Sequence, residues 1–326
     1  MTNSVLLTGA AGFIGSHVGE ALLRRGDNVV AIDNFDSFYD PAVKRRNVAK
    51  LARQSGFTLI EGDVRDDSTL RRAFARAPFT AVVHLAARAG VRPSIVDPLL
   101  YDDVNVTGTT RLLEHARCVE SGHLVLASSS SVYGGRTSVP FRESDAADRP
   151  SSPYASTKRA NELTAHVYNH VYGLDITCLR FFTVYGPRQR PEMAIHKFTR
   201  LIEAGDEVEV YGDGTSARDY TYIDDIVDGV VRAIDRPNGY SIYNLGGTAT
   251  TRLIDLVHML AARLDRPLRL RHVPDQPGDV PITYADVSLA RRDLGYVPRT
   301  PIDRGLDLFV DWYMRSPHRL ELVASA

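Results

Sequence analysis

A tyrosine and a lysine four residues apart have the types and the spacing that acid–base chemistry needs. Tyr154 and Lys158 stand in the segment Tyr-Ala-Ser-Thr-Lys, at the start of a long helical pattern. Residues four apart share one face of a helix, and the charge of a nearby ammonium lowers the pKa of a phenol. The chain has four lysines among 39 basic residues, so a lysine here indicates that an ammonium group is required.

A run of four serines could supply a second acid–base group. Ser128 to Ser131 follow the apolar stretch His123–Ala127, which we predict to be a buried strand. Doubly wound sheets bind ligands at the carboxyl ends of their strands. A hydroxyl at this place could therefore share a proton with Tyr154 and with a substrate.

Three glycines near the N-terminus predict a phosphate-binding turn. Gly9, Gly12 and Gly15 come directly after the apolar run Val5–Leu7 and open the first helical pattern. Glycines at this spacing permit a tight turn, close approach of the backbone to a pyrophosphate, and close packing of helix on strand. The N–H groups and the positive dipole end of the helix then face the phosphates.

Two aspartates predict which dinucleotide binds there. Asp33 follows the second apolar run, where a carboxylate can accept hydrogen bonds from both hydroxyls of the adenosine ribose. The same carboxylate repels a 2′-phosphate, so the sequence favours NAD over NADP. Asp63, after the third run, could contact the adenine ring or cap a turn.

Short apolar runs alternate with longer helical patterns, which predicts an α/β fold with a doubly wound parallel sheet. The predicted strands are Val5–Leu7, Asn28–Ile32, Thr58–Glu61, Ala81–Leu85, His123–Ala127 and Ile176–Arg180. The predicted helices cover residues 13–25, 40–54, 67–76, 98–120 and 153–172. After Arg180 the regular alternation of strands and helices stops. In this part we expect helices at 192–204 and 223–234 and strands at Val208–Val210 and Ile242–Leu245.

Composition excludes several classes of protein. The 326 residues are 44% hydrophobic, which is ordinary for a globular protein, and the net charge of -1 gives no basic excess for nucleic acid. Cys118 and Cys178 are too few for a disulfide framework or a Cys-rich zinc site. The sequence lacks a signal-peptide pattern and a long apolar run, so we expect a cytoplasmic protein without a membrane partner. His166 and His170 lack a third ligand, so we predict no metal.

Together these segments resemble the extended short-chain dehydrogenases/reductases, the NAD-dependent epimerase/dehydratase family. The resemblance rests on Thr8–Gly15, Asp33, Ser128–Gly134 and Tyr154–Lys158, and continues through Tyr185–Pro187, Arg218–Asp225, Asn244–Gly246 and Gln276–Asp279. It implies that Tyr154, Lys158 and Ser129 act on a nucleotide sugar while NAD stays bound. The cofactor-binding residues that it implies are Gly9, Gly12, Phe13, Ile14, Gly15, Asp33, Asn34, Asp63, Val64, Leu85, Ala86, Ala87, Tyr154 and Lys158.

Two interleaved domains follow from this resemblance. A Rossmann-like NAD-binding domain takes residues 1–182 and about 221–248, and a smaller C-terminal substrate domain takes residues 183–220 and about 249–326. The helical segments 98–120 and 153–172 could pair two copies of the chain, and we expect a homodimer.

The chain lacks acidic residues that some members of the family need, which excludes their reactions. The 4,6-dehydratases place an Asp-Glu pair where this chain has Ser130 and Ser131, and the glucuronate decarboxylases carry a Glu that is missing between Ala127 and Tyr133. Reductases that release their product need a different acid and a cofactor that exchanges. Epimerisation remains, because it requires only removal and return of a hydride.

The segment Arg180–Phe198 resembles that of the UDP-glucuronate 4-epimerases. Thr183 stands where many relatives have Asn, and an Arg-Pro-acid-Met-Ala run follows. A C6 carboxylate needs a cationic or hydroxyl partner, for which Thr183, Arg190 and Arg88 are candidates. Arg218 and Asp279 match positions that bind the diphosphate and the uridine ribose. The substrate-binding residues implied are Arg88, Ser129, Ser130, Ser131, Tyr154, Thr183, Arg190, Met193, Ala194, Tyr211, Arg218, Gln276 and Asp279.

The expected reaction is therefore interconversion of UDP-glucuronate and UDP-galacturonate through a transient 4-keto sugar. Two alternatives stay open. One is a 4-epimerase of a neutral UDP-sugar, such as UDP-glucose or an N-acetyl form. The other is a non-catalytic NAD-binding regulator on the same fold.

Overall fold

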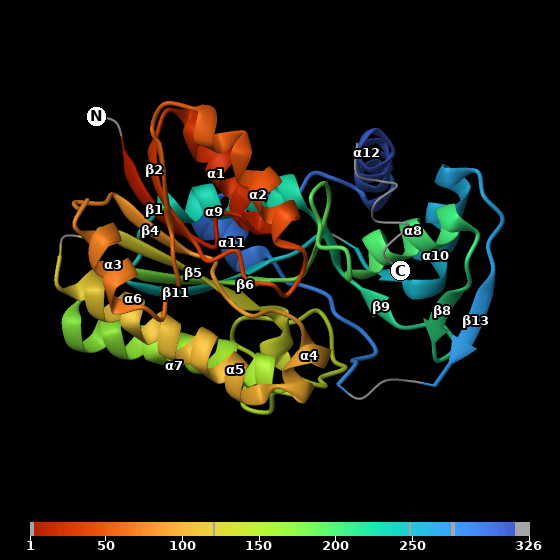
Figure 1. Ribbon diagram of the computed structural model, residues 1–326. Helices are drawn as coiled ribbons and strands as arrows, with labels where there is room; N and C mark the ends of the chain where they lie inside the picture. Colours follow the sequence, from red (N-terminus) through yellow and green to blue (C-terminus); the bar gives the residue numbers. More distant parts are fainter. Residues whose placement is uncertain (1–2, 120, 248, 275–277, 317–326) are drawn as a thin grey trace.

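Seven parallel strands form the centre of the molecule. The computed structural model describes residues 3–119, 121–247, 249–274 and 278–316. The strands run in the order β11-β6-β5-β4-β1-β2-β3 (Figure 1). Their bounds are β1 Ser4–Thr8, β2 Asn28–Asp33, β3 Phe57–Glu61, β4 Ala81–His84, β5 His123–Ser129, β6 Ile176–Phe181 and β11 Tyr240–Leu245. Every neighbouring pair is parallel, so all carboxyl ends lie at one edge, and the predicted doubly wound fold is confirmed.

Helices cover both faces of this sheet (Figure 1). One layer contains α1 Phe13–Arg25, α2 Pro41–Ala49, α9 Ile223–Ile234 and α11 Ser288–Leu294. The other contains α3 Asp67–Phe74, α4 Val91–Val96, α5 Pro98–Asp102, α6 Gly108–Arg117 and α7 Pro153–Tyr172. Successive strand side chains point to opposite faces. Val5 and Leu7 of β1 therefore pack into the core of the first layer, and Leu6 packs into that of the second.

Local sequence signals fix the ends of the two helices that matter most for the site. Ser152 caps α7 by accepting the N–H of Ala155 at 3.2 Å, and Pro153 takes the first helical position. Gly173 ends the same helix with φ 71°. This start places Tyr154 in the first turn of α7. Gly26, with φ 93°, ends α1 by donating its N–H to carbonyls of the last turn.

The structure differs from the sequence prediction at four helices, one of which, predicted at 67–76, ends at Phe74. The predicted helix 98–120 is interrupted between α5 and α6 by a π-helical turn, Asp103–Thr107. The predicted helix 40–54 ends at Ala49 and is followed by a 3₁₀ turn, Leu51–Arg53. The helix expected from residue 192 begins at Ala194.

A C-terminal lobe lies beyond one end of the sheet (Figure 1). It contains α8 Ala194–Ala204, α10 Leu253–Leu264 and α12 Ile302–Arg315, with β8 Val208–Tyr211 paired to β13 Leu270–Val273 and β9 Ala217–Arg218 paired to β12 Thr251–Arg252. β7 Thr183–Tyr185 pairs with β10 Tyr220–Tyr222 beside the main sheet. The chain thus leaves the sheet after β6 and returns to it in β11.

Candidate active site

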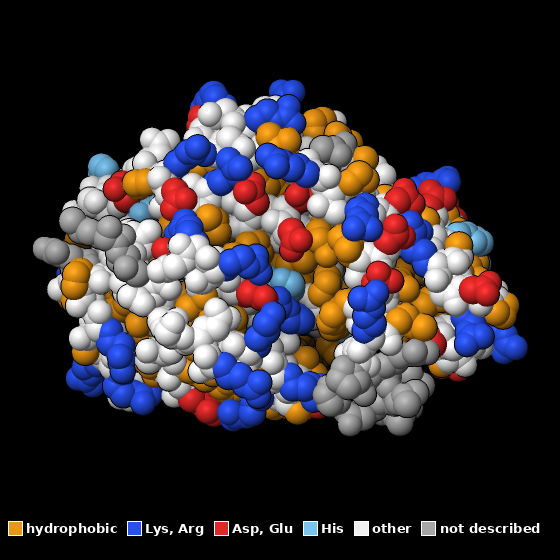
Figure 2. Space-filling view, turned by 90° about the horizontal axis from the view of Figure 1, so that it is seen from above, with side chains coloured by type: hydrophobic (Ala, Val, Ile, Leu, Met, Phe, Trp, Pro, Cys, Tyr) orange, Lys and Arg blue, Asp and Glu red, His pale blue; other side chains and the backbone are white. Residues whose placement is uncertain are grey.

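A cleft opens at the carboxyl edge of the sheet, with about 1690 Å³ of open space including its mouth. Its walls come from the segments that follow β1, β2, β4, β5 and β6 and from the start of α7. Figure 2 shows apolar side chains exposed where the main body meets the C-terminal lobe, flanked by charged side chains of both signs. The residues predicted from the sequence that line this cleft are Gly9, Gly12, Phe13, Ile14, Gly15, Asp33, Asn34, Asp63, Val64, Leu85, Ala86, Ala87, Arg88, Ser129, Ser130, Ser131, Tyr154, Lys158, Thr183, Arg190 and Met193.

The glycine turn closes tightly against its neighbours. Gly9 has φ 71°, and a Cβ there would meet the backbone nitrogen of Ala86 at 2.7 Å. A Cβ on Gly15 would lie 2.0 Å from the Gly9 carbonyl oxygen. Gly12 begins α1 without a capping side chain, so the first N–H groups of the helix are left to a ligand in the cleft. This end of the cleft has the geometry of a phosphate-binding site.

Asp33 lies at the end of β2 with both carboxylate oxygens fixed. They accept the N–H groups of Ala11 at 2.9 Å and Phe35 at 2.8 Å. Burial raises the pKa of this carboxyl despite these bonds. Each oxygen has a second lone pair, which the hydroxyls of a ribose could use.

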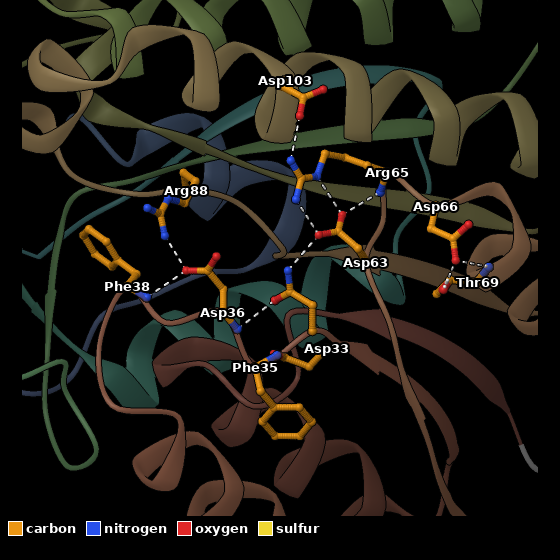
Figure 3. A network of polar contacts seen from close by, with 11 residues as sticks. Asp33, Phe35, Asp36, Phe38, Asp63, Arg65, Asp66, Thr69, Arg88 and Asp103 are labelled. Atoms are coloured by element: carbon orange, nitrogen blue, oxygen red, sulfur yellow. Dashed lines mark hydrogen bonds and ion pairs between the residues drawn. The ribbon is translucent and has the colours of Figure 1, made fainter.

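A polar network continues from Asp33 along the same wall (Figure 3). Asp63 accepts the amide N–H of Asn34 at 2.8 Å and is bound by the guanidinium of Arg65, which also pairs with Asp103 at 2.6 Å. Partial burial acts to raise the pKa of Asp63, but its hydrogen bonds to Arg65 lower it overall. Asp63 is thus held firmly in place beside the cleft.

Tyr154 and Ser129 meet at the centre of the cleft. Burial raises the pKa of Tyr154, whereas the Ser129 hydroxyl and the charge of Arg190 act to lower it. Lys158 is buried, and its ammonium donates to the Ala127 carbonyl at 2.8 Å. Burial lowers the pKa of Lys158 to about 8. A phenol with a hydroxyl partner and the positive charge of Arg190 nearby can take and return a proton.

A buried ion pair lies beneath these residues, which the sequence reasoning missed. Glu162 follows Lys158 by one helical turn and is fully buried. Its carboxylate accepts hydrogen bonds from Nε and Nη2 of Arg180, each at 2.8 Å, and from the Ser128 hydroxyl at 2.6 Å. The spacing Tyr-x3-Lys-x3-Glu was the available signal, because it puts the carboxylate on the face of α7 that carries Lys158.

The end of the cleft beside the loop after β2 carries two arginines, which the sequence analysis selected, and the loop itself, which it missed. Arg88 pairs with Asp36, and Arg190 lies 3.1 Å from Glu192. Three further side chains of the loop after β2 and the start of α2 line this end, namely Phe38, Tyr39 and Lys44. The Tyr39 hydroxyl is buried without a hydrogen-bond partner among the described residues. The only sequence signal was a set of three aromatic residues among the polar residues of this loop.

Some predicted substrate residues lie elsewhere. Ala194, Tyr211, Arg218 and Asp279 do not line the cleft, and Gln276 lies outside the described residues. Three of them meet around Arg92, which the sequence analysis did not select. Its guanidinium lies 3.0 Å from Asp279 and 4.6 Å from the Tyr211 ring. Burial lowers the pKa of Arg218, and the nearby charge of Asp279 opposes this effect.

The structure also bears on metal and membrane binding. Within the described residues, His, Cys, Asp and Glu do not gather in any group of three or more that could hold a metal ion. Over the same residues, every helix is too short or too polar to cross a bilayer.

Comparison with known proteins identifies close relatives. A profile of the "NAD dependent epimerase/dehydratase family" matches residues 5–246. The chain is 46% identical over 329 residues to "UDP-glucuronate 4-epimerase 4" of Arabidopsis thaliana, covering 95% of this chain and 75% of that protein. It is 40% identical to "Protein CapI" of Staphylococcus aureus, covering 95% and 98%.

Solved structures share the whole fold. The UDP-glucuronic acid 4-epimerase of Bacillus cereus in complex with UDP-glucuronic acid and NAD superposes with a TM-score of 0.88 at 34% identity, covering 95% of this chain and 98% of that one. The UDP-glucose 4-epimerase of Thermotoga maritima with UDP-glucose gives a TM-score of 0.89 at 30% identity, covering 96% and 99%.

Proposed function

The chain belongs to the NAD-dependent epimerase/dehydratase family, and from that premise we propose that it inverts C4 of UDP-glucuronate to give UDP-galacturonate. The observation that carries the proposal is the 46% identity to a UDP-glucuronate 4-epimerase over 95% of the chain. The cleft supports it, because Tyr154 and Ser129 lie near the cation Arg190 in one enclosed space.

NAD fits the residues of the cleft. The uncapped start of α1 suits the pyrophosphate, and Asp33 suits the adenosine ribose. Lys158 suits the second ribose, since its ammonium lies at the carboxyl end of β5. When bound, NAD accepts the hydride from C4 of the sugar and gives it back.

Tyr154 does the acid–base work of the reaction. Its phenolate takes the proton of the 4-hydroxyl, with Ser129 in the hydrogen-bond relay. Together with the C4 hydride that NAD would accept, this loss leaves a 4-keto sugar. The charges of Lys158 and Arg190 favour the phenolate. The sugar then turns about its link to the diphosphate and presents its other face, and Tyr154 returns the proton. UDP must stay anchored during this turn, and Arg218 and Asp279 are proposed as its anchors.

Thr183 and Arg190 are proposed to bind the C6 carboxylate. The 4-keto intermediate is a β-keto acid, which loses CO2 fastest when its C5–C6 bond aligns with the carbonyl π system. A hydroxyl and a guanidinium that hold the carboxylate out of this alignment would protect the intermediate. These two residues then govern the outcome of the reaction as well as binding.

A second copy of the chain is proposed to cover an apolar face of α7. Leu163, Val167 and Val171 are 53%, 50% and 58% exposed and recur every four residues, so they form one stripe on the helix. Leu99 of α5, a helix that packs against α7, is also apolar and 81% exposed. We expect Val167→Glu to convert a dimer to a monomer in sedimentation equilibrium, and an unchanged mass contradicts this arrangement.

The cellular location is also a proposal. Both cysteines are free in the structure, with Cys118 exposed and Cys178 buried. Free thiols suit a reducing compartment, so we place the enzyme in the cytoplasm.

The proposed reaction is tested by following two substrates with the purified protein by proton NMR, without added NAD. We expect UDP-galacturonate to form from UDP-glucuronate, and UDP-glucose to react at least about tenfold more slowly, because it lacks the partner of a charge-assisted hydrogen bond. Faster epimerisation of UDP-glucose would identify a neutral-sugar epimerase. Bound NAD without turnover of either substrate would favour a regulator.

A further inference from the structure

The loop after β2 places one aromatic ring against two of the cations that line the cleft, Arg88 and Arg190. The centre of the Phe38 ring lies 4.8 Å from the guanidinium carbon of Arg88 and 5.5 Å from that of Arg190. All three residues line the cleft. Both distances are within the range at which the negative face of a ring attracts a guanidinium. One ring therefore holds together two groups that repel each other.

The two arginines are held with unequal strength. Arg88 pairs with Asp36, whose carboxylate also accepts the Phe38 N–H at 2.8 Å (Figure 3). The Asn105 side chain fixes the backbone of Arg88 by accepting its N–H at 2.8 Å and donating to its carbonyl at 3.0 Å. Arg88 is thus tied both through its side chain and through its backbone.

Arg190 has a weaker partner. Its carboxylate partner Glu192 is 43% exposed, and exposed ion pairs contribute little to stability. Arg190 can therefore exchange this partner for the carboxylate of a ligand at small cost.

The charge of the cleft leaves room for one more anion. Among the described residues that line it, the cations are Lys44, Arg88, Lys158 and Arg190, and the carboxylates are Asp33, Asp36 and Asp63. Four positive and three negative groups leave one positive charge in excess. Asp36, which pairs with Arg88, lines the cleft, whereas Glu192, which pairs with Arg190, is exposed and does not line it, so Arg190 is the cation whose partner a bound anion can replace.

We propose that Phe38 is a specificity-determining residue for acidic sugars, because its ring keeps the exchangeable guanidinium of Arg190 in the cleft that Tyr154 and Thr183 also line. This inference rests on the proposed function, since only a hexuronate presents a carboxylate to Arg190. A neutral hexose gains nothing from the position of that charge.

The test measures binding by calorimetry in the Tyr154→Phe protein, in which turnover is blocked. Phe38→Leu and Phe38→Met remove the ring and keep an apolar side chain, and Phe38→Tyr keeps the ring. The ligands are UDP-glucuronate, UDP-glucose and UDP. We expect both ring-free variants to bind UDP-glucuronate about fivefold more weakly and to bind the other two within about twofold, with Phe38→Tyr like the parent.

The UDP arm also reports whether each variant is folded. If the ring-free variants lost affinity equally for all three ligands, or if Phe38→Tyr bound UDP-glucuronate as weakly as Phe38→Leu, Phe38 would have only a packing role. Either result would overturn this inference and leave the proposed function untouched. A parent protein that binds UDP-glucuronate no more tightly than UDP-glucose would overturn the proposed function, and the inference with it.

Discussion

At the scale of single residues, opposing neighbours set the proton affinity of Tyr154. Burial raises its pKa, and the Ser129 hydroxyl and the charge of Arg190 act to lower it. Lys158, with a pKa lowered by burial to about 8, remains mostly protonated at neutral pH and adds a second positive charge beside the cleft. A general base is most effective when its pKa lies near the working pH. Burial outweighs the two opposing effects on Tyr154, so its pKa stays above the ordinary value, and further positive charge in the cleft would lower it towards the working range.

Replacing Tyr154 by Phe keeps the ring contact with Tyr101 and removes the proton carrier. We expect kcat to fall by at least about 10²–10⁴-fold, with UDP-glucuronate binding nearly unchanged. Tyr172→Phe, on an exposed residue at the far end of the same helix, is the matched control. Near-normal turnover in Tyr154→Phe would rule out the acid–base assignment.

Replacing Arg190 by Met or Thr183 by Val tests control of the carboxylate. Each change removes a proposed partner of C6, so we expect UDP-glucuronate binding to weaken by about 1.5–3 kcal/mol for Arg190→Met, and UDP-glucose binding to be spared. Enzyme that still oxidises C4 should lose CO2 and accumulate a 4-keto pentose, with absorbance in the NADH band. Equal losses on both sugars and an absence of keto-pentose would favour a neutral-sugar epimerase.

At the scale of elements, the sequence predicted what depends on local pattern. The strands of the main sheet, the glycine turn and the start of α7 follow from apolar periodicity, glycine spacing and helix caps. The π-helical turn in α5–α6 and the loop after β2 could not be predicted in this way. Asn105 looks like an ordinary helix residue until the fold brings Arg88 to it, and Phe38 looks like a loop residue until two arginines surround it.

The π-helical turn gives a prediction of its own. Asn105 holds the backbone of Arg88 and donates to the Thr157 hydroxyl at 3.0 Å, so its loss leaves buried polar groups unpaired. We expect Asn105→Ala to lower the free energy of unfolding by about 1–3 kcal/mol and to raise KM for UDP-glucuronate.

The matched control is Asn169→Ala, since Asn169 also donates to a carbonyl, that of Leu174, but at the far end of α7. Urea unfolding and steady-state kinetics measure both variants. A KM that rises equally in the two variants would mean that the turn has no special relation to the cleft.

At the scale of the whole molecule, buried histidines link the stability of the fold to pH. His84 lies in β4 between Thr8 of β1 and Thr109 of α6, with its ring nitrogens 2.7 and 3.0 Å from their hydroxyls. Burial lowers its pKa from 6.5 to about 3. The unfolded chain therefore binds more protons between these values, so the stability present at neutral pH is lost as pH falls below 6.5.

This linkage predicts a difference between two variants. His84 should account for about 2 kcal/mol of the free energy of unfolding that the parent protein loses between pH 7 and pH 5. The loss in His84→Gln over the same pH range should therefore be smaller than that of the parent by about 2 kcal/mol. His258→Gln, an exposed substitution on α10, should behave like the parent protein. Urea unfolding at the two pH values measures the difference, and parallel losses in all three proteins would refute it.

The cleft lies between the sheet that positions Tyr154 and the lobe that follows it, and the proposed function depends on what happens to C4 of the sugar inside it. The most direct measurement uses UDP-glucuronate carrying deuterium at C4, incubated with the purified protein in ordinary water and followed by NMR. The hydrogen removed from C4 leaves with its electron pair and returns to the same carbon, whereas only the hydroxyl proton on Tyr154 exchanges with solvent. We expect UDP-galacturonate with deuterium retained at C4. Replacement of that deuterium by solvent hydrogen, or a product with C4 unchanged, would contradict it.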